Sequence, residues 1–154
     1  MNYEELEYAG FWVRVVASLI DGILTFIITF PVLISIYGLD YLISDEFIFF
    51  AGPADIIISW VLPAIAVIVF WITKQATPGK MAISAKIVDV SSGMAPSTGQ
   101  CIGRYLAYII SIIPLGLGVF WVAFDSRKQA WHDKLAGTVV VRRKYRGPEP
   151  VRFS

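Results

Sequence analysis

The chain contains three long apolar segments, and their length predicts the main helices. They cover residues 13–37, which Arg14 and Asp21 interrupt, and residues 56–73 and 105–124, which carry no charge. A helix needs roughly 20 apolar residues to cross a hydrocarbon core of ~30 Å. In lipid a helix also satisfies its own backbone polar groups. Each segment is therefore predicted to be a helix near spanning length.

The connections between these segments differ in charge, and this difference predicts their sides. The 38–55 loop contains acidic residues and no Lys or Arg, whereas the 74–104 connection and the tail after residue 125 are rich in both. Basic residues accumulate on cytoplasmic loops. The 38–55 loop is therefore expected outside. The N-terminus, the middle connection and the C-terminus are expected in the cytoplasm.

Three full crossings would place the two termini on opposite sides of the membrane. The third segment offers a solution, because PLGLG at 114–118 interrupts it. Proline removes a helical hydrogen bond and glycine loosens the backbone. We expect a re-entrant or broken segment with both ends cytoplasmic. The alternative is three crossings, with the acidic N-terminus or the tail outside.

The middle connection also shows strand character. Ile83, Ala85 and Ile87 alternate with more polar positions before the turn residues SSG. This pattern predicts a short β-hairpin on the cytoplasmic membrane surface, and LAGTVVVRRK at 135–144 is a second β-prone run. The predicted fold class is thus an all-α membrane protein with two transmembrane helices, a broken third segment and a short surface hairpin. It forms a single domain over residues 1–154, with a core of about 9–143 and a basic tail at 144–154.

Composition supports membrane insertion and narrows the partners. Hydrophobic residues make up 56% of the chain and charged residues 16%, whereas about a quarter of a soluble domain is charged. The net charge of +1 gives no reason to expect nucleic acid. One cysteine and one histidine cannot form an internal disulfide or a multi-histidine metal site, so no metal or cofactor is expected. RRKYR at 142–146 suits anionic lipid headgroups.

The polar residues of the first segment form one helical stripe. Arg14, Ser18, Asp21, Thr25 and Thr29 follow spacings of three and four, which places them on a single face. Arg14 can extend toward the headgroups, but Asp21 lies about ten ångströms deeper at ~1.5 Å per residue. An ionised aspartate at mid-membrane costs at least ~2.5–3.5 kcal/mol. Asp21 must therefore be paired, hydrated or protonated, and it is a candidate for proton exchange near neutral pH.

Charge partners for this stripe are expected from elsewhere in the chain, because Arg14 and Asp21 lie two turns apart. Arg104, at the start of the third segment, is the predicted partner of Asp21. Asp133 is the predicted partner of Arg14. The competing interpretation is that these charges only hold helices together.

Two motifs could indicate an enzyme, but neither has the residues that the corresponding active site needs. TPGK at 77–80 lacks the first glycine and the final Ser or Thr of a phosphate-binding loop, so we expect a turn. DSRKQAWHD, which begins at Asp125, combines acids, bases and His132, but no strained elbow surrounds Ser126, the nearest nucleophile in sequence. No enzymatic activity is expected. His132 is a candidate for lining the polar stripe or sensing pH, or is simply a surface residue.

Four stretches together resemble the RDD family of small integral membrane proteins: GFWVRVVASLID, TPGKMAISAKIVDVSSG, GRYL and DSRKQAWHDKLAGTVVV. The resemblance spans nearly the whole chain. It places the family's arginine at Arg14 and its two aspartates at Asp21 and Asp133, while Trp131 stands where the family often has leucine. It implies transport of unidentified ligands, with some members described as cation/proton antiporters.

The sequence therefore predicts a transporter of a small ion or solute in the bacterial-type plasma membrane, with cation/proton exchange as the specific form. A chain of this size encloses little volume, so a homo-oligomer is expected. The alternative is a membrane adaptor or assembly factor that does not transport. The predicted charge network is Arg14, Asp21, Arg104 and Asp133, with Ser18, Thr25, Asp125 and His132 in secondary roles.

Overall fold

Two long apolar helices project from one end of the molecule in a computed structural model, which describes residues 6–39 and 52–144. The first is α1 (Phe11–Tyr37), of 27 residues. The second is a continuous helix over Pro53–Lys74, of 22 residues. It comprises α3 (Pro53–Ile56), the π-helix η2 (Ile57–Val61) and α4 (Leu62–Lys74). Only 6% of the apolar window of each helix is buried inside the chain. Long apolar helices whose surfaces stay exposed are membrane spans, so the predicted pair of transmembrane helices is confirmed.

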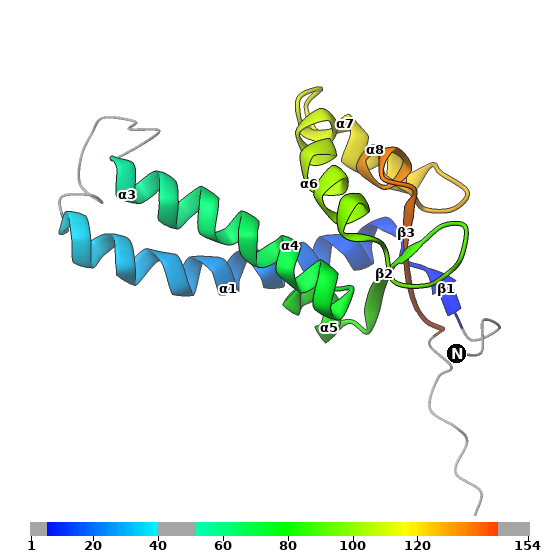
Figure 1. The fold of residues 1–154 in the computed structure, drawn as a ribbon, viewed down its shortest axis with the longest axis horizontal. Coiled ribbons are helices and arrows are strands. Elements are labelled where there is room, and N and C mark those ends of the chain that lie inside the picture. The colour runs from blue at the N-terminus through cyan, green and yellow to red at the C-terminus, as the bar shows by residue number, and fades with distance from the viewer. Residues whose placement is uncertain (1–5, 40–51, 145–154) are drawn as a thin grey trace, which may run out of the picture.

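The third apolar segment is broken. It consists of α6 (Thr98–Ile112), α7 (Leu117–Phe120) and the 3-10 helix η3 (Trp121–Ala123), with a bend of 111°. The turn between α6 and α7 needs left-handed backbone at Leu115 (φ 54°) and Gly116 (φ 77°), which glycine adopts without strain. Figure 1 shows α6 lying crosswise to α1, near the end where α1 begins. The break agrees with the prediction, while the cytoplasmic side of its two ends stays a prediction.

A three-stranded antiparallel sheet replaces the predicted hairpin. Its strands are β1 (Leu6–Tyr8), β2 (Ala85–Asp89) and β3 (Thr138–Arg143), in the order β1-β3-β2. The prediction of a hairpin within the middle connection was wrong, because β2 pairs with the β-prone run near the end of the chain. The all-α fold class therefore holds only in part.

The turn after β2 explains why no hairpin forms there. The Asp89 carboxylate accepts hydrogen bonds from the backbone N–H groups of Ser91 and Ser92 and from the side chain of Gln100. These bonds close the loop, and the Ser91 hydroxyl, followed by Gln100 and the Ser92 N–H, lowers the pKa of Asp89. Ser97 then caps α6 with a capping box that includes Gln100. The chain thus enters a helix where the prediction placed a second strand.

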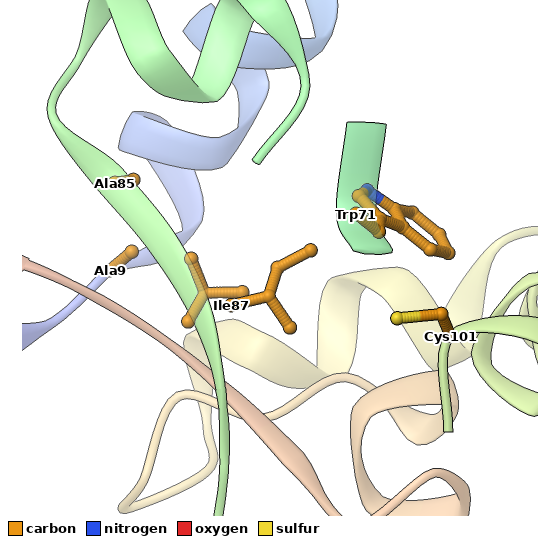
Figure 2. Close-up of a cluster of buried hydrophobic side chains, with 6 residues drawn as sticks. Ala9, Trp71, Ala85, Ile87 and Cys101 are labelled. Atoms are coloured by element: carbon orange, nitrogen blue, oxygen red, sulfur yellow. The ribbon is translucent and has the colours of Figure 1, made fainter. Parts of the chain in front are cut away.

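The core lies between the sheet, the end of α4 and the start of α6. It contains Ala9, Trp71, Ala85, Ile87, Cys101 and Val140, each at most 2% exposed. Figure 2 shows Ile87 reaching from β2 toward Trp71 and Cys101. Two short helices complete this end of the molecule, α5 (Pro78–Ala82) against α1 and α8 (Trp131–Leu135) against α6. The core therefore joins one end of the membrane helices to a compact layer (Figure 1).

Some predictions lie outside the described residues. Asp40, Asp45 and Glu46 of the acidic loop fall within 40–51, and most of the basic tail falls within 145–154.

A glycine at the α6–α7 contact offers a test of the broken segment. A Cβ at Gly118 would lie 2.6 Å from Ser111 Cα, whereas a Cβ at Gly103 meets nothing within 4 Å. We expect Gly118→Ala to destabilise the protein by roughly 1–3 kcal/mol through overpacking. Gly103→Ala should be neutral or slightly stabilising, because alanine favours helix. Thermal unfolding of both variants in detergent measures the difference, and equal midpoints would contradict the close α6–α7 packing.

Candidate functional site

Asp133 is the centre of a buried charge cluster that joins three parts of the chain. Its Oδ2 lies 2.5 Å from Arg14 Nη1, and its Oδ1 lies 2.6 Å from Arg104 Nη2. The side chains of Asp133 and Arg104 are 0% and 1% exposed, and that of Arg14 is 13% exposed. The predicted pairing of Arg14 with Asp133 is confirmed.

The local structure holds Asp133 ready for both arginines. Asp133 occupies the third position of α8, where its Oδ2 also accepts the backbone N–H of Ala130 at 3.0 Å. An aspartate there satisfies one of the free N–H groups of a helix start. Burial raises the pKa of the Asp133 carboxyl, but Arg104 and Arg14 outweigh burial and lower it to about 2. Asp133 is therefore an anion at neutral pH.

The two arginines are fixed by further contacts. Arg14 donates from Nη2 to the carbonyl of Lys128 at 2.6 Å and from Nε to the carbonyl of Ala9 at 3.0 Å. Arg104 donates from Nη1 to Thr138 Oγ1 at 2.8 Å, and its guanidinium lies 5.2 Å from the centre of the Trp71 ring. Arg104 Nη2 meets Asp133 as an ion pair without an aligned hydrogen bond. The cluster therefore links α1, α6, α8 and β3.

Asp21 has other partners than the sequence predicted. Its Oδ2 accepts from Thr77 Oγ1 at 2.5 Å and its Oδ1 accepts from the backbone N–H of Gly79 at 2.7 Å. The predicted pairing of Asp21 with Arg104 was wrong, because Arg104 is taken by Asp133. Arg14 and Asp21 lie two turns apart along α1. Arg14 therefore contacts α8, and Asp21 contacts α5.

Glycine is required where α5 meets α1. A Cβ at Gly79 would lie 2.0 Å from the Ala17 carbonyl oxygen and 2.9 Å from Asp21 Cγ. The backbone of α5 thus lies directly on α1. This close contact carries the next residue, Lys80, into the interior.

Lys80 is a buried cation with no partner among the described residues. Its residue exposure is 8%, and neither an ion pair nor a hydrogen bond engages its ammonium group there. Burial lowers the pKa of Lys80, and the Arg104 and Arg14 charges lower it further, while Tyr108 and Asp21 oppose this. The Lys80 nitrogen is not among the fully buried polar atoms that lack a partner, so it keeps accessible surface, which the cavity beside it provides.

A cavity of about 330 Å³ lies between α1, α5 and the bent α6–α7 pair. Its polar lining comes from elements far apart in the sequence and consists of Arg14, Ser18, Lys80, Tyr108 and His132. Its remaining lining is apolar: Phe11, Val15, Leu19, Val119, Phe120, Val122 and Ala130. The cavity thus combines cationic and apolar walls, and no carboxylate of residues 6–39 or 52–144 lines it.

His132 contacts Ser111 and Asp133 in an order that resembles a nucleophile–histidine–acid triad. Its Nδ1 lies 3.2 Å from Ser111 Oγ, but its Nε2 is 3.6 Å from Asp133, too far for a hydrogen bond. Ser111 is fully buried and accepts the backbone N–H of His132. Burial lowers the pKa of His132 to about 3, so the ring is a poor base. The geometry favours a neutral histidine stacked on Tyr108, with ring centres 3.6 Å apart.

The secondary residues separate into two groups. Ser18 and His132 line the cavity, as the predicted stripe requires. Thr25 instead donates to the carbonyl of Asp21 on its own helix at 2.9 Å. Asp125 pairs with Lys134 at 2.5 Å, accepts from the backbone of Gln129, and has its pKa lowered, chiefly by Lys134. The structure therefore brings neither Thr25 nor Asp125 to the cavity.

Five residues of the site were not predicted from the sequence: Thr77, Gly79, Lys80, Tyr108 and Ser111. TPGK was interpreted as a simple turn, although a threonine cap followed by Pro-Gly is the signal of a short helix that can approach another backbone closely. Tyr108 and Ser111 lie within an apolar segment, about one helical turn apart. This spacing alone does not indicate that both contact His132. Among residues 6–39 and 52–144, no group of three His, Cys, Asp or Glu side chains could hold a metal ion.

Comparison with known proteins identifies the family. The sequence profile of the RDD family matches residues 8–137. The chain belongs to the RDD family. This RDD protein is 31% identical over 147 residues to Uncharacterized protein YxaI of Bacillus subtilis (strain 168), a match that covers 86% of the chain and 96% of the relative.

A second relative matches over a shorter part. Uncharacterized protein RP437 of Rickettsia prowazekii (strain Madrid E) is 44% identical over 75 residues, which is 49% of this chain and 41% of that protein. No solved structure matches the chain significantly. The comparisons thus establish a family of membrane proteins and leave the activity to be inferred from the site.

Asp133 provides the first test of the site. Asp133→Asn removes the carboxylate that pairs with both Arg14 and Arg104. Breaking a buried pair leaves an uncompensated charge and costs about 3–5 kcal/mol. Asp125→Asn, the matched control, breaks a pair whose lysine is 44% exposed and should cost about 0–1 kcal/mol. Unfolding midpoints in detergent compare the two, and equal losses would contradict the central role of Asp133.

His132 provides a test by pH. The folded pKa of about 3 is below the ordinary value of 6.5, so the unfolded chain takes up a proton that the folded protein does not. His132 should therefore reduce stability progressively as pH falls from 6.5 toward 3, by up to about 1.4 kcal/mol per pH unit. In His132→Gln this slope should be flatter between pH 6.5 and 4.5 in unfolding experiments. An unchanged slope would show that His132 is not held neutral.

Proposed function

We propose that this RDD protein transports a small ion or solute across the membrane. The observation that carries the proposal is the cavity beside α1, where Arg14, Ser18, Lys80 and His132 converge from separate elements. Convergent polar groups in an otherwise apolar hollow are typical of a ligand site. Ionisable side chains at the start of a membrane helix commonly belong to a substrate or ion path. We propose binding and release, without covalent chemistry on the ligand.

Asp21 gives this proposal a means of coupling to protons. Its carboxylate accepts hydrogen bonds from Thr77 Oγ1 and the Gly79 N–H, and these two bonds connect α5 to α1. Protonation of Asp21 would weaken both contacts and allow α5, with Lys80, to move relative to the cavity. Exchange of cations for protons, as the family resemblance implies, stays a prediction about Asp21, since no carboxylate lines the cavity itself.

A homo-oligomer in the plasma membrane completes the proposal. The two membrane helices are only 6% buried and contact each other near η2. One copy therefore leaves most of both helical surfaces to lipid or to other copies. Further copies packed on these surfaces would be needed to enclose a path through the bilayer.

The second candidate is a membrane adaptor whose charges only fix the fold. The complete pairing of Asp133 with Arg14 and Arg104 favours it, because those three groups have no need of a ligand. The two candidates differ in what they expect of Asp21. A transporter needs an exchangeable acid there, whereas an adaptor needs only a hydrogen-bond acceptor.

Flux measurements separate the two candidates. Proteoliposomes with an imposed pH gradient are supplied with Na⁺, K⁺, Li⁺ or phosphate, and a trapped pH dye follows the gradient. We expect wild type and Asp125→Asn to dissipate the gradient when one of these ions is present. Asp21→Asn should lose this flux while keeping its thermal midpoint within a few degrees, because asparagine can still accept from Thr77. Wild-type vesicles no faster than protein-free vesicles with every ion would reject exchange of these ions for protons and favour the adaptor.

A further inference from the structure

The charges around the cavity are not balanced. Arg14, Arg104 and Lys80 are cations, and only Asp133 and Asp21 are carboxylates near them. His132 is neutral. Both bonds of Asp21 go to α5 groups other than the lysine ammonium. Three cations therefore meet two carboxylates, and in the described part of the chain the Lys80 ammonium has no ion pair, although the Asp21 charge acts on it.

Arg14 retains donors next to this unpaired lysine. A guanidinium has five N–H groups, and Arg14 uses Nε, Nη1 and Nη2 once each for Ala9, Asp133 and Lys128. Two N–H groups are left over. Arginine and lysine together are the side chains that bind phosphate and carboxylate groups. The polar end of the cavity therefore matches an anionic group with several acceptor oxygens.

The rest of the cavity matches a hydrocarbon chain. Its apolar wall begins at Phe11, whose ring stacks on Phe120 with ring centres 5.4 Å apart. Leu19 and Phe120 are 60% and 52% exposed at its rim. Both lie on apolar membrane segments, so the rim faces the bilayer. A ligand could enter from the lipid with its chain against this wall.

We propose that this cavity binds an anionic amphiphile, with a phosphate or carboxylate head at Lys80 and Arg14 and one hydrocarbon chain along the α1–α7 wall. This assignment deepens the proposed function by naming the solute class, and it rests on that function only for the step of transport. Binding itself requires only the cavity. An anion at Lys80 would supply the counter-ion that the fold does not, which explains why an unpaired lysine is buried there.

The proposal makes Lys80 unlike a structural residue. A lysine that stabilises the fold should lower stability when it is replaced. A lysine kept for a ligand should cost stability in the absence of that ligand, because partial burial and the nearby Arg104 and Arg14 charges disfavour its charge. Lys80→Met, which keeps the length of the side chain, should therefore raise or leave unchanged the thermal midpoint of the free protein while abolishing binding.

Calorimetric titration of the purified protein with dodecyl phosphate tests the assignment. Dodecyl maltoside as the detergent supplies a neutral competitor with the same chain. We expect saturable binding to wild type, at least tenfold weaker binding to Lys80→Met, and binding within about twofold of wild type for Lys86→Met, whose lysine is exposed on β2. A tenfold loss corresponds to about 1.4 kcal/mol. Dodecyl phosphate should raise the midpoint of wild type but not that of Lys80→Met.

Two further measurements keep the result decisive. If Lys80→Met does not fold, Val15→Phe, which narrows the apolar wall without changing a charge, should weaken dodecyl phosphate binding while Lys86→Met does not. Inorganic phosphate should bind at least tenfold more weakly than dodecyl phosphate, and equal affinity would overturn the hydrocarbon part of the proposal. Equal binding by wild type and Lys80→Met would overturn the whole assignment. If dodecyl phosphate binds but is not transported, the result would contradict the proposed transport and leave the binding site intact.

Discussion

The structure depends on one carboxylate shared by two arginines that lie far apart in the sequence. Asp133 binds Arg14 of α1 and Arg104 of α6, and it does so from a fully buried position. Lipid provides little hydrophobic force between helices, so polar contacts have a larger part in their arrangement. Replacing the trio with apolar residues could be harmless, but removing one member alone leaves a charge in the interior. The trio therefore fixes how α1 leaves the compact layer and enters the membrane.

A second constraint follows from the first and positions the cavity. With α1 held at Arg14, Ala17 and Asp21 form the surface on which α5 lies, and only glycine at position 79 permits the contact. Lys80 is the next residue, and it lines the cavity together with Arg14 and Tyr108. The unpaired charge is thus a consequence of a short, close helix contact. A longer or more distant α5 would leave this lysine in water.

The sequence could predict elements and some partners, but not the connections that need three dimensions. Apolar length predicted α1 and the Pro53–Lys74 span, and PLGLG predicted the break after α6. Arg14 with Asp133 was correct as a pair, while of the predicted stripe only Arg14 and Ser18 line the cavity. The hairpin failed because strand propensity does not specify a partner, and β3 comes from far along the chain. Asp21 with Arg104 failed because opposite charge alone cannot choose between two aspartates, whereas the neighbouring Thr77 and Gly79 offered uncharged donors.

The distinction between paired and unpaired charge decides how these residues should be interpreted. Arg14 and Arg104 both pair with Asp133, so these three residues have a structural role that does not depend on a ligand. Asp21 is satisfied by two hydrogen bonds, from Thr77 and Gly79, which hold α5 against α1. Within residues 6–39 and 52–144, the Lys80 ammonium has neither an ion pair nor a hydrogen bond, and it lines the cavity. Since the Arg104 and Arg14 charges oppose a third cation there, its presence is better explained by an anion that binds there than by the fold. The same lysine argues against a cation as the ligand of this cavity, because a second positive charge beside it would add repulsion in a medium that screens poorly.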